Sequence, residues 1–173
     1  MKLTSLVAAA VLALAAGGAA AEDFNVPVTF QSGAMGGYSA GFNVTHLQAG
    51  SFTDTFSFTP SVDGSATASV ITIAQSADSA WSNIDFTSAT LNGNALTLMS
   101  MGTSETGFLL PTDVLGPLTL VVTGTAGAGL DAGASISASY AGTLNAIPEP
   151  STLALALAGI GVIGMVVRRR RDA

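Results

Sequence analysis

The sequence predicts an all-β domain, an antiparallel β-sandwich or jelly-roll-like fold of about seven to nine strands. Short runs of alternating apolar and polar residues follow one another along residues 22–147, and Gly, Asn, Asp or Pro separates them. Thr, Ser and Val dominate this region, and no stretch of it keeps a helical period for long. Period-two alternation is typical of strands that bury one face, so two layers enclosing a core are expected.

The strand boundaries follow from the same pattern. Asn92-Gly93 between two of the runs predicts a two-residue hairpin turn, because both residue types tolerate positive φ. The candidate strands are Asn25–Phe30, Tyr38–Thr45, Ser51–Phe58, Ser65–Ile73, Ile84–Leu91, Ala95–Met101, Leu118–Thr125 and Ala134–Leu144.

One candidate strand places a charged residue on its apolar face. In the run Phe52-Thr-Asp54-Thr-Phe56-Ser-Phe58, period two puts the aspartate on the same face as the three aromatic residues. Burying an unpaired carboxylate is costly, so Asp54 needs partners in the core. The sequence leaves backbone N–H groups, hydroxyls, His46 or a bound cation as candidates.

Charge is distributed unevenly along the chain. All five Lys and Arg residues lie outside residues 22–147, whereas only two of the eleven acidic residues lie outside this region. Residues 22–147 therefore contain nine carboxylates and carry a formal charge of −9, compared with −6 for the whole chain. Binding to nucleic acid depends on cations that displace counterions from phosphate, so that class of partner is excluded. Cysteine is absent, which excludes disulfides, thiolate metal sites and a cysteine nucleophile.

The N-terminus, residues 1–21, has the pattern of a secretory signal peptide. An uninterrupted apolar run over residues 3–16 is too short for a spanning helix, and Ala19-x-Ala21 fits the small-x-small cleavage rule just before Glu22. We therefore expect export through the secretion translocon and an ectodomain over residues 22–147.

The C-terminal segment, residues 148–173, combines three features. Pro148-Glu149-Pro150 precedes an expected helix at about 152–167. The apolar residues 153–167 of this helix would cover about 22 Å of the roughly 30 Å hydrocarbon core. Tilt and arginine snorkelling make a marginal transmembrane helix plausible, and the cations orient it with a cytoplasmic C-terminus. The arginines that close the run are Arg168, Arg169, Arg170 and Arg171.

In this order and spacing, the tripeptide, the short glycine-containing run and the arginine cluster resemble the sorting tail of the PEP-CTERM family of exosortase substrates. Phe52, Asp54 and Phe56 are similar to the motif of its FxDxF subfamily, and residues 118–124 and 139–144 look like that subfamily's closing strands. The resemblance implies an exosortase as sorting partner and inner-membrane anchorage before processing. It also implies a later place in the cell envelope or outside the cell, with exopolysaccharide or biofilm, and no catalytic residues.

Two patterns raise the question of catalysis, and neither predicts an enzyme. Gly37-Tyr-Ser39-Ala-Gly41 matches the G-x-S-x-G nucleophile elbow, but its surroundings predict β-structure, and the only histidine, His46, follows closely with no acid between. Asp54 and Asp85 are candidates for a glycosidase carboxylate pair, although neither lies in a motif known for such a pair.

No cofactor is expected, but a structural calcium ion stays open. Asp63, Asp113 and Asp131 are predicted in loops, and calcium prefers six to eight oxygen ligands. Solvated loop carboxylates are the simpler alternative. The negative charge of residues 22–147, which have no Lys or Arg to balance it, supports the hypothesis of a bound cation.

Two functions are therefore compared. The first is a non-enzymatic envelope or matrix protein, which approaches anionic polysaccharide only through bridging cations because like charges repel. The second is a carbohydrate-binding module that uses exposed rings from Tyr38, Trp81 or Tyr140. Two or more of these rings on one surface would favour the module.

Overall fold

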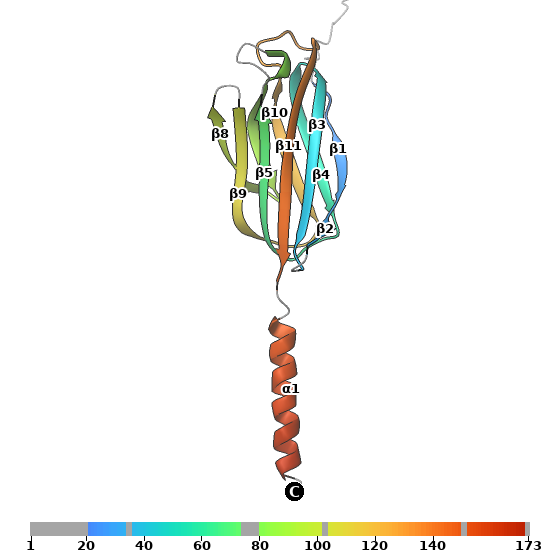
Figure 1. Cartoon of the computed structure of the whole chain (residues 1–173), viewed down its shortest axis with the longest axis vertical. Coiled ribbons are helices and arrows are strands. Elements are labelled where there is room, and N and C mark those ends of the chain that lie inside the picture. The colour runs from blue at the N-terminus through green and yellow to red at the C-terminus, as the bar shows by residue number, and fades with distance from the viewer. Residues whose placement is uncertain (1–20, 34–35, 74–79, 102–103, 150–151, 172–173) are drawn as a thin grey trace, which may run out of the picture.

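The computed structural model describes residues 21–33, 36–73, 80–101, 104–149 and 152–171 (Figure 1). Strands make up most of this part of the chain, and a helix follows them. The strands are β1 (Asn25–Thr29), β2 (Gln31–Ser32), β3 (Tyr38–Gln48), β4 (Gly50–Thr59), β5 (Gly64–Ile73), β6 (Ile84–Leu91), β7 (Asn94–Ala95), β8 (Thr97–Met101), β9 (Ser104–Val114), β10 (Leu118–Ala126) and β11 (Ser135–Pro148). A single 3₁₀ turn, η1 (Ala80–Ser82), precedes β6, and the helix is α1 (Thr152–Arg171).

The strands form two sheets. The first sheet has the order β1-β4-β10-β6-β7, and the second has the order β2-β3-β11-β5-β9-β8. Only the β1–β4 pairing is parallel among the described strand pairs, and the others are antiparallel. The prediction of an all-β, mainly antiparallel domain is confirmed.

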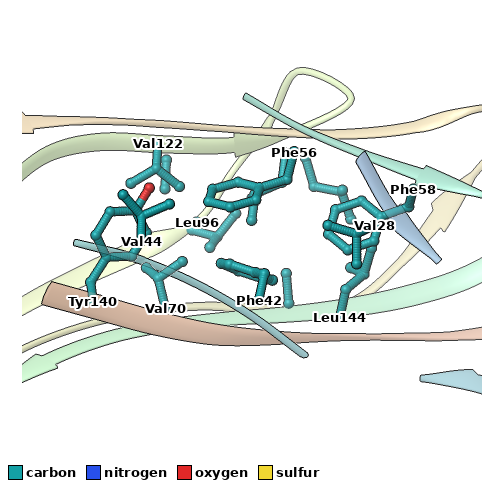
Figure 2. Close-up of a cluster of buried hydrophobic side chains, with 14 of the residues drawn as sticks. Val28, Phe42, Val44, Phe56, Phe58, Val70, Leu96, Val122, Tyr140 and Leu144 are labelled. Atoms are coloured by element: carbon teal, nitrogen blue, oxygen red, sulfur yellow. The ribbon is translucent and has the colours of Figure 1, made fainter. Parts of the chain in front are cut away.

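Side chains from both sheets share one hydrophobic core. Phe42 of the second sheet and Phe56 of the first face each other, with ring centroids 4.3 Å apart (Figure 2). On β3, β4, β10 and β11, buried and outward-facing residues alternate along the strand. The period-two pattern of the sequence therefore reports correctly which face of these strands is buried.

The predicted hairpin is confirmed. Asn92 and Gly93 connect β6 to β7 with φ values of 47° and 84°, which are both in the left-handed region that a type I′ turn requires. The Asn92 side chain also accepts from the Thr119 N–H at 2.7 Å, so the turn is fastened to β10.

Strand β9 was not predicted, and its sequence explains why. Its inward positions include Glu105 and Gly107, so the apolar alternation that marks the other strands is missing. Pro111 lies beyond the end of the β8 pairing and within a register shift against β5. A proline lacks the N–H that a regular ladder needs, and such an edge position tolerates it.

The helix α1 covers the run predicted as a membrane span at about 152–167, and its described side chains are exposed. Within the described part of the chain, none of the helices combines the length and apolar character needed to span a membrane. The helical conformation is confirmed, and the transmembrane role is not. The predicted signal peptide lies outside the described residues except for Ala21.

Candidate functional site

The most unusual group in the core is the carboxylate of Asp54. It lies on β4 between Phe52 and Phe56 and is fully buried, as the alternation of this strand predicts. Residues 22–147 contain no Lys or Arg. The charge on Asp54 is therefore held by hydrogen-bond donors alone.

Three donors from three segments converge on Asp54. The Tyr140 hydroxyl on β11 donates to Oδ2 at 2.6 Å, and His46 Nε2 on β3 lies 3.1 Å from the same oxygen. The backbone N–H of Phe24 donates to Oδ1 at 2.9 Å. Backbone, hydroxyl and His46 were all candidate partners, and all three are used. Because β3 and β11 belong to the opposite sheet, one carboxylate joins both sheets and the N-terminal segment.

The hydrogen bonds favour one tautomer of His46. Its Nδ1 is buried and has no hydrogen-bond partner among the described residues. A buried N–H without an acceptor costs more than a buried bare lone pair, so Nδ1 carries no proton and Nε2–H donates to Asp54. The cluster therefore places the Phe24 N–H, the His46 Nε2–H and the Tyr140 hydroxyl around one carboxylate.

Aromatic rings keep water away from this cluster. Phe52 stacks on His46 with ring centroids 4.2 Å apart, and Phe86 meets the Tyr140 ring edge to face at 5.5 Å. Figure 2 shows the Tyr140 hydroxyl pointing across the core toward the sheet that carries Val122. Burial raises the pKa of the Tyr140 phenol far above its usual value, and the hydrogen bond to Asp54 and the negative charge there raise it further.

The described residues do not assemble either catalytic pattern considered from sequence. Ser39 of the G-x-S-x-G run is exposed on β3, while His46 points inward from the other face of that strand. Asp85 follows the buried Ile84 on β6 and bonds Asn83 at 2.7 Å, on the outward side of the sheet whose inner face holds Asp54. Both arrangements separate the groups that would have to act together.

The three carboxylates predicted in loops were the candidates for a structural calcium site. Among the described residues no group of three or more His, Asp or Glu side chains is placed to hold a metal ion. Asp131 lies in the turn just before β11, and the Asp63 carboxylate accepts from the Gly116 N–H at 2.6 Å just before β5. The prediction that Asp113 lies in a loop is wrong, because it belongs to β9 and pairs with Ser65, near Asp63.

The three aromatic candidates for carbohydrate binding do not form one platform. Tyr140 is 2% exposed in the core, and Tyr38 packs against Phe30 at 5.7 Å. Trp81 is 56% exposed in η1 near the start of β11, whereas Tyr38 pairs with Ala146 near the end of that strand. The rings therefore lie in three different environments.

The predicted sorting residues begin on the domain itself. Pro148 is the last residue of β11 and pairs with Gly64, and the exposed Glu149 donates its N–H to the Asp63 carbonyl at 3.0 Å. Pro150 lies outside the described residues. Arg168 and Arg169 are exposed on α1, and Arg170 and Arg171 complete that helix.

At the other end, the predicted cleavage position borders the core. Ala19 lies outside the described residues, but Ala21 is 3% exposed and donates its N–H to the Ser51 carbonyl at 2.9 Å. Glu22 is exposed. Cleavage before Glu22, which stays a prediction, would remove a residue that packs in the core.

The hydrogen bonds of two acidic residues, Glu105 and Asp63, were not predicted from the sequence. Glu105 on β9 is buried and accepts from the Phe86 N–H, although its strand has no apolar alternation to indicate it. Asp63 was interpreted as a loop carboxylate, but its backbone and side chain each bond a separate part of the chain. The Asp-Gly pair at 63–64 was the available signal for a backbone of special geometry.

The comparison with family models identifies the C-terminal segment. Residues 146–171 match the model of the PEP-CTERM protein-sorting motif. No curated protein and no solved structure matches the chain. The matched segment starts inside β11 and ends with the last arginine of α1.

Replacing Asp54 by Asn removes the charge that three donors share. The Asn side chain offers one acceptor and presents two N–H donors to a site that already holds donors, so we expect the free energy of unfolding to fall by about 2–4 kcal/mol. Urea denaturation followed by circular dichroism measures this. The matched control is Asp23→Asn, because the exposed Asp23 accepts from the Thr53 N–H and an amide oxygen can do the same. Equal losses in both variants would contradict the role of Asp54.

Alkaline pH tests Tyr140 separately. The folded-state pKa lies above that of the unfolded chain, about 10, so the stabilisation is complete below that pH and declines above it. We expect the unfolding free energy of the wild type to fall by about 1.4 kcal/mol per pH unit more steeply above pH 10 than that of Tyr140→Phe. Urea midpoints across this pH range measure the difference. Parallel curves for the two proteins would show that Tyr140 does not contribute.

Proposed function

Because the chain carries a PEP-CTERM protein-sorting motif, we propose that it is an exported, non-enzymatic envelope or extracellular-matrix protein that an exosortase sorts and processes. Its β-rich part is proposed to be a β-sandwich ectodomain. The single observation that carries this proposal is the match of residues 146–171, which begins where the last strand ends its core contacts.

A motif of this kind implies export and a stage at which the protein is anchored in a membrane. The apolar part of α1 is shorter than an ordinary membrane span. We therefore propose that it anchors the chain by a marginal crossing of the inner membrane, in which the arginine side chains extend to the cytoplasmic surface. Ile160, Val162, Ile163 and Met165 are each 61–73% exposed. Contiguous apolar side chains of this size are unfavourable in water and favourable among lipid chains, which supports a membrane environment for the helix.

The lack of an enzymatic role is part of the proposal. The cluster of polar groups with the strongest mutual interactions, around Asp54, lies in the core where His46 and Asp54 have no exposed surface. A substrate has no access to such a cluster in the folded protein. Its geometry supports a structural role, which is the joining of two sheets.

The proposed partner after sorting is extracellular polysaccharide. The three central strands of the second sheet, β3, β11 and β5, carry no Asp, Glu, Lys or Arg. Their outward face instead holds hydroxyl pairs, with Thr45 and Ser139 at 2.8 Å and Ser69 and Thr143 at 3.0 Å. Such a surface suits neutral sugars, while the negative charge elsewhere opposes an anionic polymer unless cations bridge the two. The dispersed rings of Tyr38, Trp81 and Tyr140 do not favour a specialised carbohydrate-binding module.

Sorting is tested by replacing Pro148, Glu149 and Pro150 with alanine in cells that produce the exosortase. We expect the variant to stay in the membrane fraction at the mass of the unprocessed protein, as the wild type does when the exosortase is deleted. Cell fractionation and immunoblotting measure both. The control is Pro111→Ala, which changes an exposed proline of β9 that lies outside the motif. Normal processing of the alanine variant would refute sorting by this motif.

Polysaccharide association is tested by affinity electrophoresis of the processed protein. We expect retardation in gels that contain a neutral polysaccharide, and in gels with an anionic polysaccharide only when calcium is added. A chelator should reverse the second effect but not the first. Calcium-independent binding to the anionic polymer would contradict the proposal, because a domain without Lys or Arg has no charge to attract it.

A further inference from the structure

The sorting motif starts without any spacer after the core. Strand β11 is central in the second sheet, between β3 and β5, and Leu144 and Ala146 on it are fully buried. The family match begins at Ala146, so its first residues are also the last residues of the domain. Processing therefore takes place close to a strand that cannot be withdrawn without opening the sheet.

Beyond Ala146, the chain is held at one place, which we call the exit corner and define as Asp63, Gly64 and Gly116. Pro148 pairs with Gly64 and has no N–H to donate. The next residue, Glu149, supplies the last backbone hydrogen bond, from its N–H to the Asp63 carbonyl at 3.0 Å. This contact adds one more position to the β5–β11 ladder after the regular pairing ends.

The exit corner is itself fixed from a second direction. The Asp63 carboxylate accepts from the Gly116 N–H at 2.6 Å, and the Val62 N–H donates to the Gly116 carbonyl at 3.2 Å. Val62 is buried. The carbonyl that receives Glu149 is therefore anchored between the core and the turn that leads into β10.

Gly64 is the residue that permits this close approach. A Cβ at this position would lie 2.2 Å from the Ile147 carbonyl oxygen and 2.8 Å from the Glu149 nitrogen. Both atoms belong to the backbone and cannot move aside without releasing the strand end. Only glycine lets the start of the motif lie against β5 in this way.

We infer that the exit corner is a seat for the beginning of the sorting motif, and that it directs processing to a peptide bond on the C-terminal side of Glu149. This inference rests on the proposed function, because it presupposes an exosortase. The seated residues stay with the domain, and the enzyme engages the chain after Glu149.

The reason is that a processing enzyme must take the peptide into its own site. The backbone of Pro148 and Glu149 is already paired with β5 and Asp63. The peptide bonds that precede Glu149 therefore become available to an enzyme only when the strand end detaches. In the reaction, the carbonyl carbon on the domain side exchanges its bond to nitrogen for a bond to water or a primary amine, and a proton passes to the departing nitrogen. That exchange needs a carbonyl that is free from the sheet.

The mass of the processed wild-type protein from exosortase-producing cells tests the inference. We expect products that end at Glu149 or later to exceed products that end earlier by about tenfold or more, because detachment breaks the Glu149 hydrogen bond to Asp63 and opens the Pro148–Gly64 pairing. A main product that ends at Pro148 or earlier would overturn the inference and leave the sorting proposal intact. Identical products with and without the exosortase would overturn both.

A pair of glycine variants tests the seat itself. Gly64→Ala should release the strand end and add products that end before Glu149. The control is Gly37→Ala, because a Cβ there lies beside the same strand end at an ordinary 3.6 Å from the Ala146 carbonyl oxygen. Circular dichroism confirms that each variant is folded. A folded Gly64→Ala protein with the wild-type product pattern would show that the corner does not direct processing.

Discussion

A fully buried carboxylate, Asp54, in a domain that has no Lys or Arg to pair with it, sets the constraint on which this structure depends. Asp54 cannot leave the inner face of β4 without moving Phe52 and Phe56 out of the core, because the three share one face of the strand. The carboxylate is stabilised only when Phe24, His46 and Tyr140 all reach it. The alignment of the two sheets and the path of the N-terminal segment are thus fixed by the same requirement.

This constraint extends to the C-terminal end through β11. Tyr140, which donates to Asp54, lies on the strand that ends at Pro148. Pairing on both sides holds that strand in register, with Tyr140 opposite Val44 on β3 and opposite Thr72 on β5. A one-residue slip would turn Tyr140 outward and leave Asp54 without its closest donor. The same slip would displace Glu149 from Asp63. The buried charge therefore also determines where the sorting motif leaves the domain.

The sequence was informative wherever alternation of apolar and polar residues was clean. It predicted the inward position of Asp54 and the hairpin at Asn92-Gly93, because both depend on local pattern. It did not predict β9, where Glu105 and Gly107 occupy inward positions and tertiary packing overrides the local signal. It indicated which kinds of group could bind Asp54 but not which residues do so. His46 and Tyr140 come from the opposite sheet, and a local pattern does not show how two sheets are aligned. The exit corner depends mainly on backbone atoms, so its sequence signal is limited to the pair Asp63-Gly64.

The order of the strands has a consequence for export. The seat combines residues near 63, residue 116 and the end of β11, which are brought together only when β11 enters between β3 and β5. The last strand of the domain is thus the one that completes the sheet, and it is continuous with the sorting motif. A chain whose β-rich domain has not folded cannot hold Glu149 against Asp63. The position at which the motif leaves the domain is therefore a property of the folded protein and not of the motif's own sequence.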